Sequence, residues 1–436
     1  MGLAALRDHE DRIRGIRRLQ PRRDKQLTGT AKALLDQVVT RQLQANNAQH
    51  ALSPSLRRDI QAGLKPQTTN CYAPCFIQWS NYCASVGAET MPAEPYTLAS
   101  FLSSASDTNS TMEPTKKRVN AINYFHSIAG HPAPCQHPFV QHVIRGITNR
   151  LGCRNIPREP LSLTDLLSAR AAARTGGESG LAFVADVSIV MQEAQLRWDD
   201  VADMRLGDIV WGTSAARLLV VDSKTDRLHQ GHFATVAASS SADSAYRTLL
   251  RLIQQGIDRF AQYSPQTACS LLRELQQQQP RLPYQQPSLS SISTLPIHIR
   301  EAAGRCSLPL ENLPLLGAWP FERHPASLLT PLSYNKFLFH LKRLFQNRPH
   351  IGTHSMRRGG VTDKMGQGIE PRLVQWLGRW KTAEAFEGYV GSRANIAKAA
   401  EAIERARRAG AGAGGSVDAP APWSRQRGAS AQAKRR

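Results

Sequence analysis

The chain has 436 residues, a length typical of two or three domains, and carries 55 Lys and Arg against 34 Asp and Glu, a formal net charge of +21. A charge of this size favours a polyanionic partner. Nucleic acid is the first candidate, and a membrane surface is the alternative. The sequence has no apolar run of about 18 residues and no secretory signal pattern, which predicts no transmembrane helix. Seven cysteines, an odd number in a long chain, favour reduced thiols in an intracellular protein.

Residues 1–65 form a predicted basic N-terminal arm, partly disordered, with a helical pattern in its second half. Residues 66–155 carry amphipathic helical patterns separated by short loops rich in Pro, Gly and Ser. The first of these helices places one aromatic and thiol face toward a core and ends at Gly87. Its core face comprises Tyr72, Cys75, Phe76, Trp79 and Cys83. This region predicts a helical bundle of four or five helices.

Residues 156–400 combine helices with a single β signal, and we predict one further domain here. Three short β-branched runs, 208–212, 216–223 and 232–237, flank a polar turn and predict a small hairpin or sheet. Residues 280–331 lack clean periodicity and are interpreted as an insertion. Helices resume after Ser333, a predicted N-cap.

Residues 401–436 are predicted to hold the end of a C-terminal helix and a basic, disordered tail. The predicted fold class is therefore mainly α with a small β hairpin or sheet.

The segment GTHSMRRGG sets His354 three residues before Arg357, so on a helix the two side chains share one face. Imidazole transfers protons near neutral pH, and guanidinium binds two oxygens of a phosphate. A His and an Arg at this spacing occur often by chance, so the pair alone does not indicate a functional site. However, Trp380 follows Arg357 by 23 residues and Tyr389 follows Trp380 by nine.

Further upstream, the segment LRWDDVADMRLGDI places Arg197 at a predicted helix start with Asp200 one turn later, and Lys224 lies in the polar turn. In this order and spacing the residues resemble the tyrosine recombinase (phage integrase) family. The forms HSMRRGG and LGRW are most similar to the recombinases of eukaryotic DIRS-like retroelements and Crypton elements. The resemblance implies a helical core-binding (SAM-like) bundle followed by a mixed α+β catalytic domain.

The resemblance also implies a role for each residue. Tyr389 would attack a DNA phosphodiester, giving a 3′-phosphotyrosyl link and a free 5′-hydroxyl. His354 would accept or relay the tyrosine proton, and Lys224 would protonate the leaving oxygen, with Arg227 as the alternative general acid.

Four more residues complete the implied site. Arg197 and Arg357 would hold the scissile phosphate, and Trp380 would serve positioning and packing because its indole cannot shuttle protons. Asp200 stands where the family usually has Glu and would brace the catalytic helices. No metal or cofactor is expected, since the cationic side chains supply the positive charge.

Lys116, Lys117 and Arg118 open a bundle helix, and the resemblance suggests that they contact DNA phosphates, although a solvated helix face explains them equally. The cysteines of the bundle offer an alternative zinc site. No C-x-x-C pair occurs, and Cys75 and Cys83 fit an apolar face, which favours core thiols.

The predicted function is site-specific recombination or integration by a mobile element, without ATP or metal. The expected partners are duplex DNA with inverted half-sites and further copies of the chain, as a homodimer on each site and a homotetramer in the synapse. A membrane is not expected, and the expected location is intracellular, in the nucleus if the host is eukaryotic. The alternatives are a type IB topoisomerase-like or telomere-resolving enzyme, or a domesticated sequence-specific DNA-binding protein.

Overall fold

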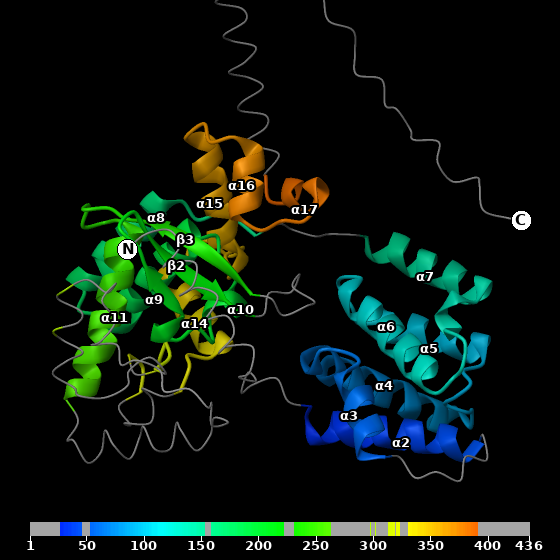
Figure 1. Cartoon of the computed structure of the whole chain (residues 1–436). Helices are drawn as coiled ribbons and strands as arrows, with labels where there is room; N and C mark the ends of the chain where they lie inside the picture. The colour runs from blue at the N-terminus through cyan, green and yellow to red at the C-terminus, as the bar shows by residue number, and fades with distance from the viewer. Residues whose placement is uncertain are drawn as a thin grey trace, which may run out of the picture. The chain divides into compact units, whose positions relative to one another are not determined.

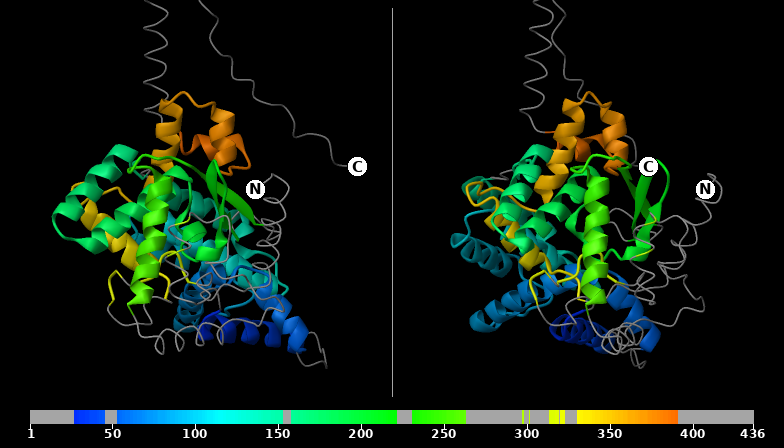
Figure 2. Two further views of the ribbon diagram at one scale, coloured as in Figure 1. Left: turned by 60° about the vertical axis from the view of Figure 1, so that its left-hand side comes forward. Right: turned by 90° about the vertical axis from the view of Figure 1, so that its left-hand side faces the viewer.

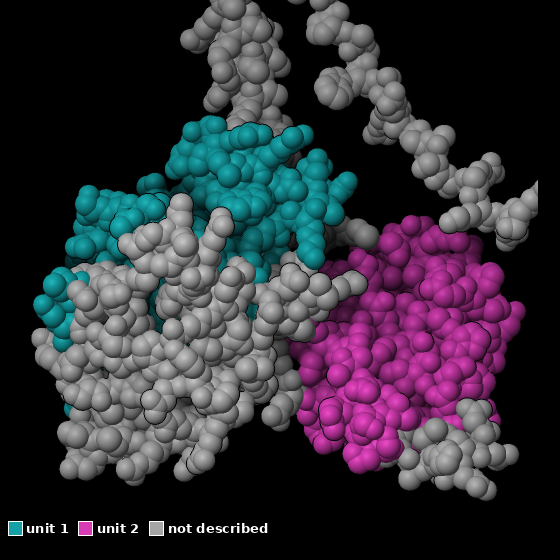
Figure 3. Space-filling view, viewed as in Figure 1, with its two compact units in different colours: residues 1–6, 158–271, 286–436 teal, residues 7–157, 272–285 magenta. Residues whose placement is uncertain are grey.

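The protein is described by a computed structural model. The structure describes residues 27–45, 53–152, 158–221, 231–262, 297, 301, 313–318, 320–322 and 330–390. The predictions for Lys224, Arg227, residues 1–26, most of the insertion and the tail lie outside these ranges. The chain divides into two compact units, which Figure 3 distinguishes by colour: unit 2 holds the described residues up to 152 and unit 1 those from 158 onward.

Within its described residues, unit 2 contains helices joined by loops, and no strand. Its helices are α2 (Gly29–Ala45), α3 (Pro54–Ala62), α4 (Pro66–Val86), α5 (Pro95–Asp107), α6 (Glu113–Ile128) and α7 (Pro138–Leu151), with a short 3₁₀ turn at Pro134–Gln136 (Figure 1). Helix α4 packs on α6, and α5 packs on α7.

Helix α4 confirms the predicted apolar face. Phe76, Trp79 and Cys83 are buried in the core, whereas Tyr72 and Cys75 are only partly buried at its edge. The helix ends at Gly87 in the left-handed region, at φ +71°, a conformation that glycine adopts without strain.

Part of the predicted N-terminal arm belongs to this same core. Helix α2 packs against α4, and its Leu35 and Val38 are buried among the core residues of unit 2. Apolar side chains at a spacing of three or four residues lose contact with water only against a partner helix. Residues 29–45, the helical part of the predicted arm, are therefore one of the helices of the bundle.

Unit 1 adds a small sheet to a set of helices. The helices are α8 (Leu163–Thr175), α9 (Ser179–Glu193), α10 (Trp198–Val201), α11 (Ala245–Ala261), α14 (Tyr334–Leu344), α15 (His354–Gly366), α16 (Pro371–Leu377) and α17 (Ala383–Glu387). The strands are β1 (Ile209–Trp211), β2 (Ala215–Val220) and β3 (His232–Ala237), in antiparallel order β1-β2-β3. In register, Leu218 of β2 faces Ile209 of β1 and Ala234 of β3. The predicted fold class, mainly α with a small sheet, is confirmed.

Helix α9 is the central element of unit 1. All of its residues from 182 to 192 are buried, and α8, α11, α14 and α15 pack around it. A helix that is buried on every side is apolar all round rather than amphipathic. Figure 2 shows α11 beside the sheet, with α15, α16 and α17 gathered at one end of the unit.

Two glycines let α15 approach its neighbours closely. A Cβ on Gly359 would overlap the carbonyl of Leu161, and a Cβ on Gly360 would overlap that of Gln192 at the end of α9. The two glycines of RRGG therefore set the position of the helix that carries His354 and Arg357.

Among the described residues, no helix combines the length and apolarity needed to cross a membrane.

Candidate active site

Helix α15 presents its first turn as the centre of the site. His354 is its first residue and is exposed, whereas Arg357, one turn later, is fully buried at 0% exposure. The predicted spacing therefore places imidazole and guanidinium on one helix face, at two different depths.

Arg357 is held on several sides. Its Nη1 donates to the carbonyl of Gln195 and its Nη2 to the carbonyl of Gly378. Its guanidinium lies 4.0 Å from the centroid of the Trp380 ring, close enough for a cation–π interaction. The same guanidinium lies 5.5 Å from the centroid of Tyr389. Because these contacts fix both ends of the fork, the side chain has little freedom to turn.

Tyr389 reaches the site from just beyond α17. Its hydroxyl lies 3.2 Å from Nδ1 of His354, within hydrogen-bonding distance. The centroid of its ring lies 4.9 Å from that of the Trp380 ring, edge to face, and the centroid of the Phe386 ring lies 5.3 Å from that of Trp380. The structure thus brings Tyr389, His354, Trp380 and Arg357 together.

Arg197 and Asp200 come from the start of α10. Arg197 is the N-cap of α10, the predicted helix start, and its backbone N–H donates to Oδ2 of Asp200 at 2.9 Å. Asp200 is 3% exposed. After burial, the nearby cation of Arg197 is the next cause that lowers the pKa of Arg357. Arg197 therefore belongs to the same electrostatic site.

Sequence reasoning missed Arg379. Its Nη2 donates to Oδ2 of Asp200 at 2.9 Å, and it adopts φ +61°, which is uncommon for a residue other than glycine. The only sequence signal was its place in LGRW, directly before Trp380.

Arg358 was also missed. Its Nη1 donates to the carbonyl of Gly388 at 2.7 Å and so ties α15 to the residue before Tyr389.

The site carries excess positive charge. The guanidiniums of Arg197, Arg357 and Arg379 surround the one carboxylate of Asp200. Burial, and then repulsion from Arg197 and Arg379, lowers the pKa of Arg357 to about 9. Within the part of the chain that the structure describes, several buried N–H groups here have no hydrogen-bond partner: Gln195 Nε2, Arg197 Nη1, Arg357 Nε, Arg358 Nε, Arg379 Nε and Trp380 Nε1. Cations and unused donors together are what an anion such as a phosphodiester requires.

No group of His, Cys, Asp and Glu suited to a metal occurs among the described residues. In unit 2, Cys83 and Cys135 are buried, and burial raises their pKa to about 11 and about 12, so both stay protonated. These thiols are part of the apolar core.

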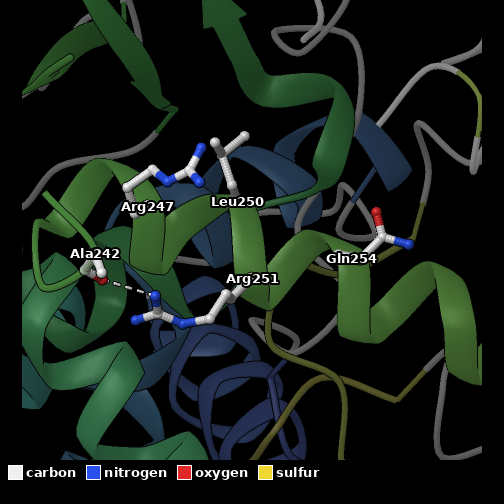
Figure 4. Close-up of a pocket in the computed structure, with 5 residues that line it drawn as sticks. All are labelled: Ala242, Arg247, Leu250, Arg251 and Gln254. Carbon is white, nitrogen blue, oxygen red and sulfur yellow. Dashed lines mark hydrogen bonds between the residues drawn. The ribbon is translucent and has the colours of Figure 1, made fainter. Parts of the chain in front are cut away.

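A hollow beside α11 lies elsewhere in unit 1 (Figure 4). Its Arg251 donates to the carbonyl of Ala242 at 2.9 Å and to the hydroxyl of Thr248 at 2.8 Å. Arg251 also contacts the buried carboxylate of Asp186, as does Arg170. These groups hold α8, α9 and α11 together, and we assign no ligand to the hollow.

Unit 2 presents two basic surfaces. Lys116 pairs with Glu113 at 3.0 Å, Lys117 is exposed, and Arg118 donates to the side chain of Gln78 at 3.3 Å. A second surface is a groove between α5 and α7, whose lining includes Ser103, His142, Arg145 and Arg150.

No protein-family model and no curated protein matches the chain. Similar solved structures include the Tn1549 transposon integrase in complex with circular intermediate DNA, at 9% identity, 84% of this chain, 98% of that chain and a TM-score of 0.43. The XerH site-specific recombinase bound to difH substrate is 12% identical, and the match covers 86% of this chain and 97% of that chain with a TM-score of 0.42. A lambda integrase dimer bound to a COC′ core site is 14% identical, and the match covers 82% of this chain and 95% of that chain with a TM-score of 0.38.

Proposed function

We propose that this chain is a site-specific DNA recombinase of the tyrosine recombinase type, which cuts and rejoins duplex DNA. One observation carries the proposal: the hydroxyl of Tyr389 lies 3.2 Å from Nδ1 of His354, beside the buried guanidinium of Arg357. A phenol next to a base and a fixed cation is the arrangement that nucleophilic attack on a phosphodiester needs.

The proposed reaction starts from a phosphodiester seated among the arginines. The oxygen of Tyr389 attacks phosphorus while His354 accepts its proton, and the bond to the 5′-oxygen breaks. The strand end becomes a 3′-phosphotyrosyl ester, and the other end leaves as a 5′-hydroxyl. Reversal with a different 5′-hydroxyl joins strands without ATP, because the energy of the bond is kept in the ester.

Each cation has a proposed part. Arg197 Nη1 and Arg357 Nε, two of the buried N–H groups without a partner, would bind the non-bridging oxygens of the phosphate. The N–H of Trp380 would donate to the same phosphate. Protonation of the leaving oxygen is assigned to Lys224, with Arg227 as the alternative; both lie outside the described residues.

Duplex DNA is the proposed partner of both units. The exposed basic residues at the start of α6 and along the α5–α7 groove would neutralise backbone phosphates. We extend the proposal to homodimers on inverted half-sites, a homotetramer during strand exchange and an origin in a mobile element with DIRS-like or Crypton affinity. For a eukaryotic host we propose a nuclear location.

The test is capture of the covalent intermediate. The full chain would be mixed with nicked duplexes in which the neighbourhood of the nick is randomised, and with duplex DNA that flanks its coding region. Cleavage close to a nick releases a short strand, so the adduct cannot reverse and survives denaturation.

Wild type is expected to form a denaturant-stable adduct, and Tyr389→Phe, which keeps the ring against Trp380, is expected to form none. Equal adduct from both proteins, or none from wild type on any duplex, would contradict the proposal. Once a duplex is recovered, joining of two copies of it favours a recombinase, whereas relaxation of a plasmid carrying one copy favours the topoisomerase alternative.

A further inference from the structure

Arg379 has a backbone conformation that the surrounding structure imposes. It follows Gly378, whose Cα lies so close to the Trp380 ring and the Gln195 side chain that a Cβ would overlap both. Arg379 itself adopts φ +61°. A residue other than glycine remains in the left-handed region only where its contacts determine it, and such residues gather at functional sites.

The side chain of Arg379 supplies those contacts. It is 11% exposed, and its Nη2 donates to Oδ2 of Asp200 at 2.9 Å and to the carbonyl of Gln195 at 3.2 Å. Its Nη1 lies 3.4 Å from the carbonyl of Ala194. The guanidinium is therefore directed into the turn that leads from α9 to α10.

Both acceptors of Arg379 Nη2 also hold an arginine of the proposed phosphate site. Oδ2 of Asp200 accepts from the backbone N–H of Arg197, and the carbonyl of Gln195 accepts from Nη1 of Arg357. One side chain thus contacts the support of each of the two arginines. Removing it would leave Asp200 buried beside fewer cations and would free the turn at residues 194–197.

We infer that Arg379 is a positioning residue, which acts through Asp200 and the carbonyl of Gln195 to hold Arg197 and Arg357 in register for one anion. This inference rests on the proposed function for the identity of the anion as a DNA phosphodiester. Both terminal nitrogens of Arg379 already donate to Asp200 and to the carbonyls of Ala194 and Gln195, so we assign Arg379 no contact with that phosphate.

The first test uses inorganic phosphate as the probe and requires no cognate DNA. Binding to the full chain at constant ionic strength would be followed by ³¹P line broadening for wild type, Arg379→Lys and Arg379→Gln. We expect Arg379→Gln to weaken phosphate binding by about tenfold or more, because charge-assisted, two-pronged binding needs both arginines in place. The phosphate affinity of Arg379→Lys should lie between those of wild type and Arg379→Gln, since Lys keeps the charge but lacks the planar fork that reaches both acceptors.

Lys364→Gln is the matched control. Lys364 is also a buried cation that bonds α9, through the carbonyl and carboxylate of Glu193 at 3.0 and 3.2 Å, but it supports neither arginine. A purely structural loss in this unit would lower phosphate binding in Lys364→Gln as well; positioning predicts that this variant binds like wild type.

A second variant guards against misfolding. Asp200→Leu with Arg379→Met removes both members of the ion pair, so neither is left buried without the other, and the unit is expected to fold. It should lose phosphate binding as Arg379→Gln does. If it binds phosphate as well as wild type, the inference is overturned.

The last arm uses a DNA duplex recovered by adduct capture, with a methylphosphonate at the scissile position. The neutral linkage needs less positive charge, so the ratio of wild-type to Arg379→Gln cleavage should shrink from about 100 on phosphate to below about ten. An unchanged ratio would contradict the inference that Arg379 positions the two arginines for a charged phosphate.

Failure of wild type to form any adduct, with the phosphate results as expected, would overturn the recombinase proposal and leave the Arg379 inference standing. Equal cleavage of phosphate DNA by wild type and Arg379→Gln would overturn the Arg379 inference and leave the recombinase proposal standing.

Discussion

Arg357 and Arg358 are adjacent in the sequence but point to different parts of the site. Arg357 is fully buried with its fork on two carbonyls, whereas Arg358 reaches the carbonyl of Gly388 at 2.7 Å. The first fixes a cation, and the second fixes the backbone that presents Tyr389. A pair of arginines in one motif thus performs two separate tasks.

Replacing Arg358 tests the second task. In Arg358→Gln the residue before Tyr389 loses its tether, so the hydroxyl spends less time beside His354. We expect adduct formation to slow by about tenfold, in line with the sensitivity of reactions to misplacement of a reacting group. Single-turnover cleavage measures this rate. Arg343→Gln on α14, whose partner Glu178 is solvent-exposed, should cleave at the wild-type rate.

Helix α15 depends on its close packing. In Gly359→Ala the new Cβ would overlap the carbonyl of Leu161, a backbone atom that cannot simply rotate away. We expect a loss of about 1–3 kcal/mol in stability, as for other overpacked sites. Thermal unfolding checks this. In Gly366→Ala, at the end of the same helix, the Cβ meets nothing within 4 Å. That variant should be neutral or slightly more stable, and equal losses in both would contradict the packing account.

Helix α6 carries a buried histidine whose two nitrogens are both used. Nδ1 of His126 lies 2.8 Å from the carbonyl of Ile122, and Nε2 accepts the N–H of Ala93 at 3.1 Å. Accepting a hydrogen bond requires the neutral ring. Burial, and then the nearby His131, lowers the pKa of His126 below its usual 6.5.

Unit 2 should therefore lose stability in acid. The unfolded chain takes up a proton on His126 below about pH 6.5 whereas the folded chain does not, so stability is complete above that pH and falls below it, by up to about 1.4 kcal/mol per pH unit. Hydrogen exchange of the α6 amides at about pH 7.5 and about pH 5.5 measures the change. His126→Phe should reduce this pH dependence. An unchanged dependence would show that another group is responsible.

Local patterns predicted most of the secondary structure. The core face of α4, its stop at Gly87 and the three strands were visible because alternation and helical spacing are properties of neighbouring residues. The grouping of Arg357, Trp380 and Tyr389 in one site was expected from the family resemblance that their order and spacing carry. Arg379 could not be predicted, because its partner Asp200 is 179 residues away and its positive φ is imposed by tertiary packing. The inclusion of α2 in the bundle likewise depends on distant partners.

The net charge of +21 acts at the scale of the whole molecule. Exchange of Lys116, Lys117 and Arg118 for Ala should weaken binding to non-specific duplex DNA. It should also reduce the slope of log affinity against log salt by about two to three, one for each lost phosphate contact. Lys117 is exposed while Lys116 pairs with Glu113, so the single exchange of Lys117 should account for about one unit. Fluorescence anisotropy at several salt concentrations measures the slope. An unchanged slope would place the DNA on another surface, such as the α5–α7 groove.

The central claim is that Tyr389 becomes covalently joined to DNA. The most direct measurement is mass spectrometry of the captured adduct after digestion with trypsin and nuclease. We predict a peptide of residues 382–393 in which a nucleotide is joined through a phosphodiester to Tyr389, whose hydroxyl lies beside His354. The modified peptide should be absent from the Tyr389→Phe variant. A nucleotide attached to any other residue, or a denaturant-stable adduct that persists in Tyr389→Phe, would contradict the account.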